Sequence, residues 1–202
     1  MSVVFASIGM SLDGYIAGPN AGPGNALGDG GHRIHEWALD LDGGEEDRGR
    51  DDADEHVVRE IRLRAGAYVM GRWMFDEGGA RRPDPPPFRA PAFVLTHHAR
   101  EPWTRRRGAP FTFVTDGVTT AVEQARDAAR DKDVQVVGGA TTVQQCLEAG
   151  VLDELQIHLA PVLLGSGVRL FDRVTAGGRR FDTTRVIGSR GVTHLRYRVS
   201  DT

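Results

Sequence analysis

Apolar and polar positions along the chain follow two periods, and these periods predict a series of strands and helices. Short apolar runs bounded by glycine, proline or charged residues are typical of buried strands. Such runs predict strands over residues 2–9, 67–70, 92–96, 111–115 and 134–137. Apolar residues at helical spacing predict helices over residues 32–41, 53–65, 118–130 and 140–149. Later strands are predicted around Ile157 and over residues 181–188 and 192–199.

The order of these elements predicts the fold class. Strand and helix alternate through the first three quarters of the chain, and only strands follow. This order indicates an α/β fold with a mostly parallel central sheet, helices on both faces and a C-terminal antiparallel hairpin. The length of 202 residues suits one domain spanning residues 1–202. Segments rich in glycine, proline or acidic residues, at 17–31, 42–52 and 78–91, are predicted to be loops.

The composition of the chain disfavours several kinds of partner and location. The net charge of −3 offers no broad basic surface, which disfavours nucleic-acid binding. The sequence contains no run of eighteen apolar residues and no recognisable signal peptide, so we expect neither a membrane span nor export. Cys146 is the only cysteine, which excludes an intramolecular disulfide and a multi-cysteine zinc site. A cytoplasmic protein acting on a small molecule, without a metal, is the simplest expectation.

Three predicted strands end in residues that can approach an anion. They are followed by Gly71-Arg72, by Thr96-His97 and by the segment 138–141, which reads Gly-Gly-Ala-Thr. Ligand sites of parallel α/β sheets lie outside the carboxyl ends of the strands. Glycines before a helix let a phosphate reach the free N–H groups of its first turn. The alternatives are an ordinary strand-to-helix turn, a surface arginine and an exposed loop histidine. Neither familiar glycine-rich nucleotide fingerprint is present.

Five segments resemble, in order, the reductase family that contains dihydrofolate reductase and the C-terminal reductase domain of RibD. They are SLDGYIAG (11–18), YVMGRWMFD (68–76), FVLTHH (93–98), VQVVGGATTVQQCL (134–147) and DELQIHLAPVLLGSGVRLFD (153–172). The first and last favour the RibD-like branch. The resemblance implies a dihydrofolate-reductase-like three-layer fold and NADPH as the hydride donor.

The resemblance also implies positions for the cofactor. Arg72 would face the adenosine 2′-phosphate, and Gly9 and Ile16 would flank the nicotinamide. The full implied set is Gly9, Ile16, Gly71, Arg72, Thr96, His97, Gly138, Gly139, Ala140 and Thr141. One departure is Met74, which stands where dihydrofolate reductases carry a threonine, so a phosphate-contacting hydroxyl is lost.

The proton donor is not fixed by the sequence. Asp13 and Glu36 are candidates, together with His35 and a bound water, and Asp13 is equally an Asp-Gly turn residue. His158 points to the opposite face of its strand from its two apolar neighbours, and that face is either cleft or solvent. The acidic segment before Gly71 does not align residue by residue with the acidic helix of dihydrofolate reductases, so no catalytic acid is assigned from it.

The expected function is NADPH-dependent hydride transfer to a small heterocyclic or sugar-linked substrate. The resemblance implies a 5-amino-6-(5-phosphoribosylamino)uracil reductase-like activity of the riboflavin-biosynthesis type, and a homodimer. The zinc deaminase motifs of RibD are absent from the sequence, so we expect a stand-alone reductase domain. Alternatives are dihydrofolate reductase proper and a non-catalytic nucleotide- or flavin-binding module.

Overall fold

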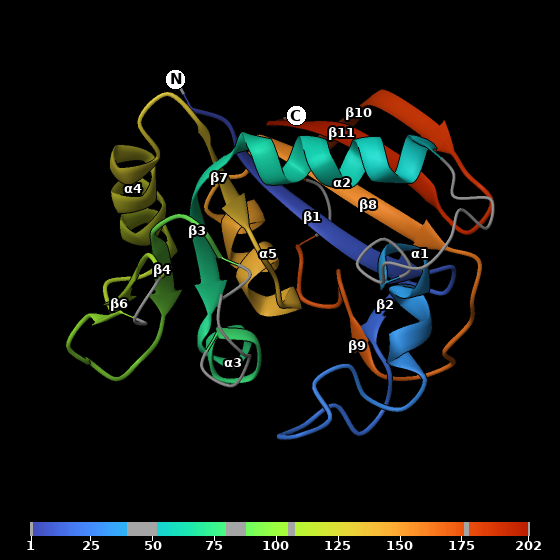
Figure 1. The fold of residues 1–202 in the computed structure, drawn as a ribbon, viewed down its shortest axis with the longest axis horizontal. Helices are drawn as coiled ribbons and strands as arrows, with labels where there is room; N and C mark the ends of the chain where they lie inside the picture. Colours follow the sequence, from blue (N-terminus) through green and yellow to red (C-terminus); the bar gives the residue numbers. More distant parts are fainter. Residues whose placement is uncertain (1, 40–51, 80–87, 105–107, 176–177, 202) are drawn as a thin grey trace.

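A single mixed sheet organises the chain (Figure 1). The computed structural model describes residues 2–39, 52–79, 88–104, 108–175 and 178–201. Within these residues, nine strands form one sheet in the order β10-β11-β8-β1-β7-β3-β4-β6-β5. Most of the predicted loops at 42–52 and 78–91, and the end of the helix predicted over 32–41, lie outside the described residues.

The middle of the sheet is parallel, as the alternation of strands and helices predicts. Its strands are β1 (Val4–Ser11), β3 (Ala65–Gly71), β4 (Ala92–Leu95), β6 (Pro110–Val114), β7 (Asp133–Val136) and β8 (Glu154–Ala160). The antiparallel strands are β5 (Trp103–Thr104), β10 (Arg179–Gly188) and β11 (Thr193–Asp201). A small separate sheet pairs β2 (Tyr15–Ala17) with β9 (Val168–Arg169). The dihydrofolate-reductase-like fold class and the C-terminal hairpin are confirmed.

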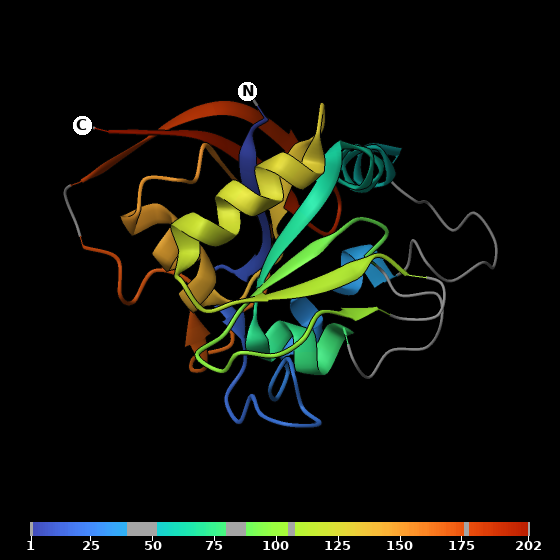
Figure 2. The ribbon, with the colours of Figure 1, turned by 90° about the vertical axis from the view of Figure 1, so that its left-hand side faces the viewer.

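Helices cover both faces of this sheet, which completes the three layers. On one face lie α4 (Val118–Ala129) and α5 (Ala140–Glu148), and on the other lies α2 (Asp52–Arg64). Figure 2 shows α2 end-on, with β3 between it and α4. Four short helical segments complete the chain: η1 (Gly31–Ile34), α1 (Glu36–Leu39), α3 (Arg72–Met74) and η2 (Phe75–Gly79).

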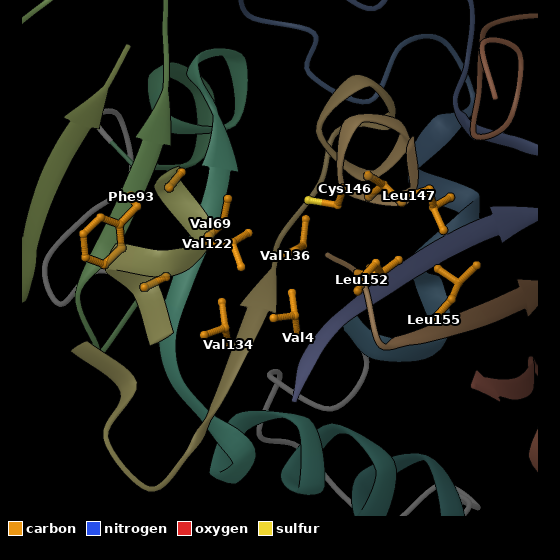
Figure 3. Close-up of a cluster of buried hydrophobic side chains, with 14 of the residues drawn as sticks. Val4, Val69, Phe93, Val122, Val134, Val136, Cys146, Leu147, Leu152 and Leu155 are labelled. Atoms are coloured by element: carbon orange, nitrogen blue, oxygen red, sulfur yellow. The ribbon is translucent and has the colours of Figure 1, made fainter. Parts of the chain in front are cut away.

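The largest core lies between the sheet and the α4–α5 layer. Alternation along β1 sends Val4 to this core and Phe5 to the opposite face, where Phe5 packs against α2. Figure 3 shows apolar side chains from β1, β3, β4, β7, β8, α4 and α5 meeting in the larger core. Each fully buried Val or Leu side chain stabilises the fold by about 1.5–3 kcal/mol relative to an exposed one. This packing holds the strand ends, where the site lies, in fixed positions.

The segment predicted as one helix over residues 32–41 begins as two short pieces. The 3-10 turn η1 ends at His35, whose backbone leaves the helical region, and α1 begins at Glu36. Apolar spacing alone cannot detect this break, because Ile34 and Trp37 keep helical separation across it. Strands β2, β5 and β9 were not predicted, because two or three residues are too few to show a period. No helix in the described part of the chain is long and apolar enough to cross a membrane.

Candidate functional site

The three strand ends singled out from the sequence lie at one edge of the sheet. In register, Val69 of β3 pairs with Val136 of β7, and Gly71 pairs with Leu95 of β4. The Gly71 N–H points to the Gly138 carbonyl oxygen at 3.5 Å. Parallel strands bring their carboxyl ends to the same side, so segments more than sixty residues apart in the sequence become neighbours.

The Gly138–Gly139 turn leads directly into the first turn of α5. Gly138 has a φ of +96°, a conformation that favours glycine, and the peptide between the two glycines is cis. The Gly139 carbonyl accepts the first helical bonds, from Thr142 N–H at 3.1 Å and Val143 N–H at 3.3 Å. The N–H groups of Ala140 and Thr141 therefore precede the intrahelical ladder, where they can bind an anion.

Open space faces this turn. A Cβ built on Gly139 meets no heavy atom within 4 Å, so a ligand can approach the backbone there. Thr142 is buried, and a Cβ on Gly71 would lie 2.8 Å from its Oγ1, so Gly71 permits β3 to pass close to α5. Thr141 is exposed at the mouth of the turn, and Ala140 is buried. The residues present therefore fit a phosphate-bearing ligand.

Arg72 begins α3 and has an intramolecular partner. Its Nε lies 2.9 Å from both carboxylate oxygens of Asp76, one helical turn later, with side-chain exposures of 39% and 41%. Asp76 offsets the Arg72 charge at the start of α3, so the position of this cation is not by itself evidence for a bound anion. Among the residues that the structure describes, the hydrogen bonds of Arg72 use Nε alone, which leaves the N–H groups of both Nη atoms for a phosphate.

Thr96 and His97 follow β4 at the same edge. The Thr96 N–H donates to the Val114 carbonyl at 3.1 Å, and its Oγ1 accepts from the His98 N–H at 3.2 Å. His97 is exposed to solvent. The Thr96 hydroxyl thus shapes the turn, while the His97 ring is free to meet a ligand from solution.

Gly9 lies further along the edge, beneath the η1–α1 junction. A Cβ on Gly9 would come within 2.9 Å of Ile34 Cγ2 and of His35 Cε1, so this position requires glycine. Burial lowers the pKa of His35, which keeps its ring neutral at pH 7. Ile16 lies on β2 and packs partly against the large core.

Asp13 fastens the turn between β1 and β2 to the loop that follows β8. It accepts hydrogen bonds from Ser11 Oγ at 2.6 Å, Gly165 N–H at 2.7 Å and Leu164 N–H at 3.2 Å. The Ser11 bond, opposed by desolvation and reinforced by the two backbone bonds, lowers the pKa of Asp13 to about 2. A carboxylate so strongly ionised orders the loops and is a poor proton donor.

The other acidic candidate is far more exposed. Glu36 has a side-chain exposure of 61%, and its Oε1 lies 3.7 Å from His32 Nε2, four residues earlier. Within the described part of the chain, no hydrogen bond or ion pair joins Glu36 to the strand ends. Neither acidic candidate is therefore placed to protonate a buried acceptor.

The structure reveals a buried polar chain that sequence reasoning missed. Ser7 Oγ lies 2.7 Å from His158 Nε2, and His158 Nδ1 lies 2.7 Å from His194 Nδ1. His194 Nε2 in turn lies 2.8 Å from Asp54 Oδ1. The His158 side chain is thus buried rather than exposed to solvent, because α1 and α2 cover this face of β8. A histidine between apolar residues in a central strand was the available signal, and its partners are up to 151 residues away.

Comparison with solved structures defines the class. The fold matches a protein from Shewanella sp. PV-4 assigned to riboflavin biosynthesis, with a TM-score of 0.70, 22% identity and coverage of 98% of this chain and 99% of that one. It matches dihydrofolate reductase from Enterococcus faecalis, complexed with NADP(H) and RAB-propyl, with a TM-score of 0.54, 15% identity and coverage of 98% and 97%. The chain therefore has the dihydrofolate-reductase-like fold.

A longer protein shares the fold over part of its length. The Thermotoga maritima diaminohydroxyphosphoribosylaminopyrimidine deaminase/5-amino-6-(5-phosphoribosylamino)uracil reductase matches with a TM-score of 0.60 and 15% identity. The match covers 98% of this chain and 56% of that protein. No curated protein sequence matches the chain.

The family follows from the sequence model. The model of the RibD C-terminal domain matches residues 2–190, nearly the whole chain. The chain belongs to the RibD C-terminal domain family, a family of reductases.

Proposed function

We propose that the protein is an NADPH-dependent reductase of the RibD C-terminal type. The observation that carries this proposal is the open turn at Gly139, which presents the first N–H groups of α5 beside Gly71 and Arg72. A pyrophosphate needs such unpaired N–H groups, and a 2′-phosphate needs a cation a short distance away. Membership of the RibD C-terminal domain family also supports a reductase function.

Each part of the cofactor has residues that would hold it. Ala140 and Thr141 would bind the pyrophosphate, Arg72 the 2′-phosphate, and the β1 backbone at Gly9 the nicotinamide end. NADPH supplies a hydride. The protein would orient the acceptor against the hydride donor and exclude water.

The substrate class we propose is a small heterocyclic or sugar-linked compound. Its support is family membership and the reductase activity named for the Thermotoga relative, 5-amino-6-(5-phosphoribosylamino)uracil reduction. Absorbance of NADPH at pH 7 during incubation with that compound, and separately with dihydrofolate, tests the choice. Oxidation of NADPH with dihydrofolate alone would instead indicate that the protein is a dihydrofolate reductase. Binding of NADPH with no turnover of any heterocycle would favour the binding-module alternative.

Arg72 provides a sharp test of cofactor choice. Arg72→Ala should weaken NADPH binding roughly 10–100-fold and leave NADH binding unchanged, because a charge-assisted hydrogen bond contributes about 1.5–3 kcal/mol. Asp76→Asn should tighten NADPH binding, since it removes the competing carboxylate at 2.9 Å. Fluorescence titration measures the affinity of the wild type and of each variant for NADPH and for NADH. Arg59→Ala, on the exposed side of α2, is the control. Equal weakening of NADPH and NADH by Arg72→Ala would refute the role.

We also propose a homodimer built on the β10–β11 hairpin. β10 is an edge of the sheet, and its register shift between Thr183 and Arg185 brings the exposed Phe181 and Val186 to one face. Light scattering after size exclusion, with Val186→Asp as the disrupting variant, tests this. The cytoplasmic location and the single-domain organisation remain predictions.

A further inference from the structure

A chain of four polar side chains crosses the sheet on the face covered by α2. Ser7, His158 and His194 come from the adjacent strands β1, β8 and β11, and Asp54 comes from α2. His158, His194 and Asp54 are only 4%, 5% and 7% exposed. Successive contacts of 2.7, 2.7 and 2.8 Å make it continuous. None of the four belongs to the proposed cofactor site.

The hydrogen bonds of this chain must all run in one direction. With Asp54 as a carboxylate, His194 Nε2–H donates to it, and a neutral His194 then has Nδ1 as an acceptor. His158 Nδ1–H donates to that nitrogen, which leaves His158 Nε2 as an acceptor for the Ser7 hydroxyl. Every proton therefore points toward Asp54, and Ser7 can offer a ligand only its lone pairs.

One added proton reverses the entire chain. Whether it enters at His194 or at Asp54, His194 Nδ1–H then donates to His158, and His158 Nε2–H donates to Ser7 Oγ. The Ser7 hydroxyl becomes free to donate outward. The contacts stay in place while the direction of each changes, which is the property of a proton-conducting chain.

The surroundings keep the proton away from the middle of the chain. Burial, together with the smaller effects of His194, His35 and Arg196, lowers the pKa of His158 to about 3. The ring of Trp37 packs over both imidazoles, with centroids 5.0 and 4.9 Å away. The other titratable or polar groups facing the pair are His35 at the η1–α1 junction, Gln156 of β8, Arg185 of β10 and Arg196 of β11.

Both arginines near the pair have carboxylate partners. Arg185 and Arg196 pair with Glu60 of α2, and Arg196 also lies 3.5 Å from Glu154. Desolvation of Glu60 is outweighed by its two arginine partners, which lower its pKa. Neither arginine is left as an unpaired cation beside the imidazoles, and the charged group hydrogen-bonded to the chain itself is Asp54.

The Ser7 end of the chain lies two residues from Gly9. Ser7 and Gly9 share one face of β1, and Gly9 is the direct cross-strand partner of His158. Gly9 is where the nicotinamide end of the cofactor is proposed to lie. The chain thus runs from α2, across one face of the sheet, to the strand that is proposed to hold the nicotinamide end.

We propose that Asp54, His194, His158 and Ser7 form a relay that supplies the proton accompanying hydride transfer. This inference rests on the proposed reductase function. As the acceptor receives the hydride that bound NADPH would supply, the Ser7 hydroxyl proton moves to the acceptor nitrogen or oxygen. His158 Nε2 returns a proton to Ser7, and His158 Nδ1 takes one from His194 Nδ1. His194 Nε2 keeps its proton, or receives it from Asp54 where the added proton was on Asp54. The products are NADP⁺, the reduced substrate and the chain in its neutral arrangement, which solvent recharges.

Nitrogen NMR of the imidazoles tests the relay without any ligand. In wild-type protein labelled with ¹⁵N-histidine, His158 should be the Nδ1–H tautomer at pH 8 and should switch to the neutral Nε2–H tautomer as the pH falls within the folded range. Variants His158→Gln and His194→Gln assign the signals, and the exposed His56 on α2 serves as an internal reference. A His158 ring that never changes tautomer, or that becomes doubly protonated, would overturn the relay.

Steady-state kinetics of Ser7 variants test the relay independently of the reductase proposal. Ser7→Ala should lower kcat roughly 100-fold, typical of a lost general acid, with KM and the NADPH dissociation constant unchanged. Ser7→Thr should restore kcat, and His56→Gln should match wild type. Full kcat in Ser7→Ala would overturn the relay and leave the reductase intact. Failure of the wild-type protein to bind NADPH would refute the reductase proposal. The NMR measurement would still show whether the His158 tautomer switches with pH.

Discussion

Replacing Gly139 with alanine separates the requirements of the cofactor from those of the fold. Gly139 has φ −73° and ψ −166°, an extended conformation that alanine adopts without strain. The added methyl group meets no heavy atom of the protein within 4 Å. A substitution from glycine to alanine in a compatible conformation stabilises a protein by about 0.4–1 kcal/mol, because it restricts the unfolded chain. The variant should therefore fold as well as wild type.

The same methyl group would occupy the space through which a pyrophosphate approaches α5. Displacing the phosphate from one N–H of Ala140 or Thr141 removes a hydrogen bond to a charged group. Such a bond contributes about 1.5–3 kcal/mol to the binding free energy. At 1.4 kcal/mol for each factor of ten, the NADPH dissociation constant should rise roughly 10–100-fold. NADH should be weakened equally, because both dinucleotides carry the pyrophosphate.

The assay pairs urea unfolding with fluorescence titration of NADPH and NADH. Gly178→Ala is the matched control, since its Cβ also meets nothing within 4 Å and Gly178 precedes β10, away from the turn. Unchanged affinity for both dinucleotides in a folded Gly139→Ala protein would refute the pyrophosphate site. A large loss of stability would instead refute the claim that the space at Gly139 is open.

Two further predictions concern protonation. The folded-state pKa of Asp13, about 2, lies below its ordinary value of 3.8, so its contribution to stability is present above about pH 4 and is lost as the pH falls toward 2. Asp13→Asn should thus be less stable than wild type in urea at pH 7, with the difference shrinking at pH 2.5; an equal difference at both pH values would contradict this. Burial raises the pKa of the Cys146 thiol to about 12, so a thiol reagent at pH 8 should label it only after denaturation. Rapid labelling of the native protein would show that Cys146 is not in the core.

Short-range patterns predicted most of the elements correctly. The apolar runs located the parallel strands, and the spacing of Ala121, Val122 and Ala125 located α4, whose buried side is formed by these residues. The glycines at 138 and 139 marked the turn before α5. These features depend on neighbours a few residues away, which a single sequence displays directly.

Contacts of charged groups were harder to predict. Asp76 stands four residues after Arg72, a spacing that places both on one side of a helical turn, so this pair was readable in principle. The surroundings of Asp13 were only partly readable. Ser11, two residues away, contributes most to lowering the pKa of Asp13, but the Leu164 and Gly165 N–H groups that reinforce it come from the loop after β8, 151 and 152 residues later.

The sequence by itself determined the order of strands and helices, the family, and the three strand ends that can meet an anion. Folding alone places those ends at one edge of the sheet and buries His158 in a polar chain. Periodicity records which face of an element is apolar, but not which other element covers it. His194 and Asp54 are 140 residues apart, and they meet because β11 pairs with β8 under α2.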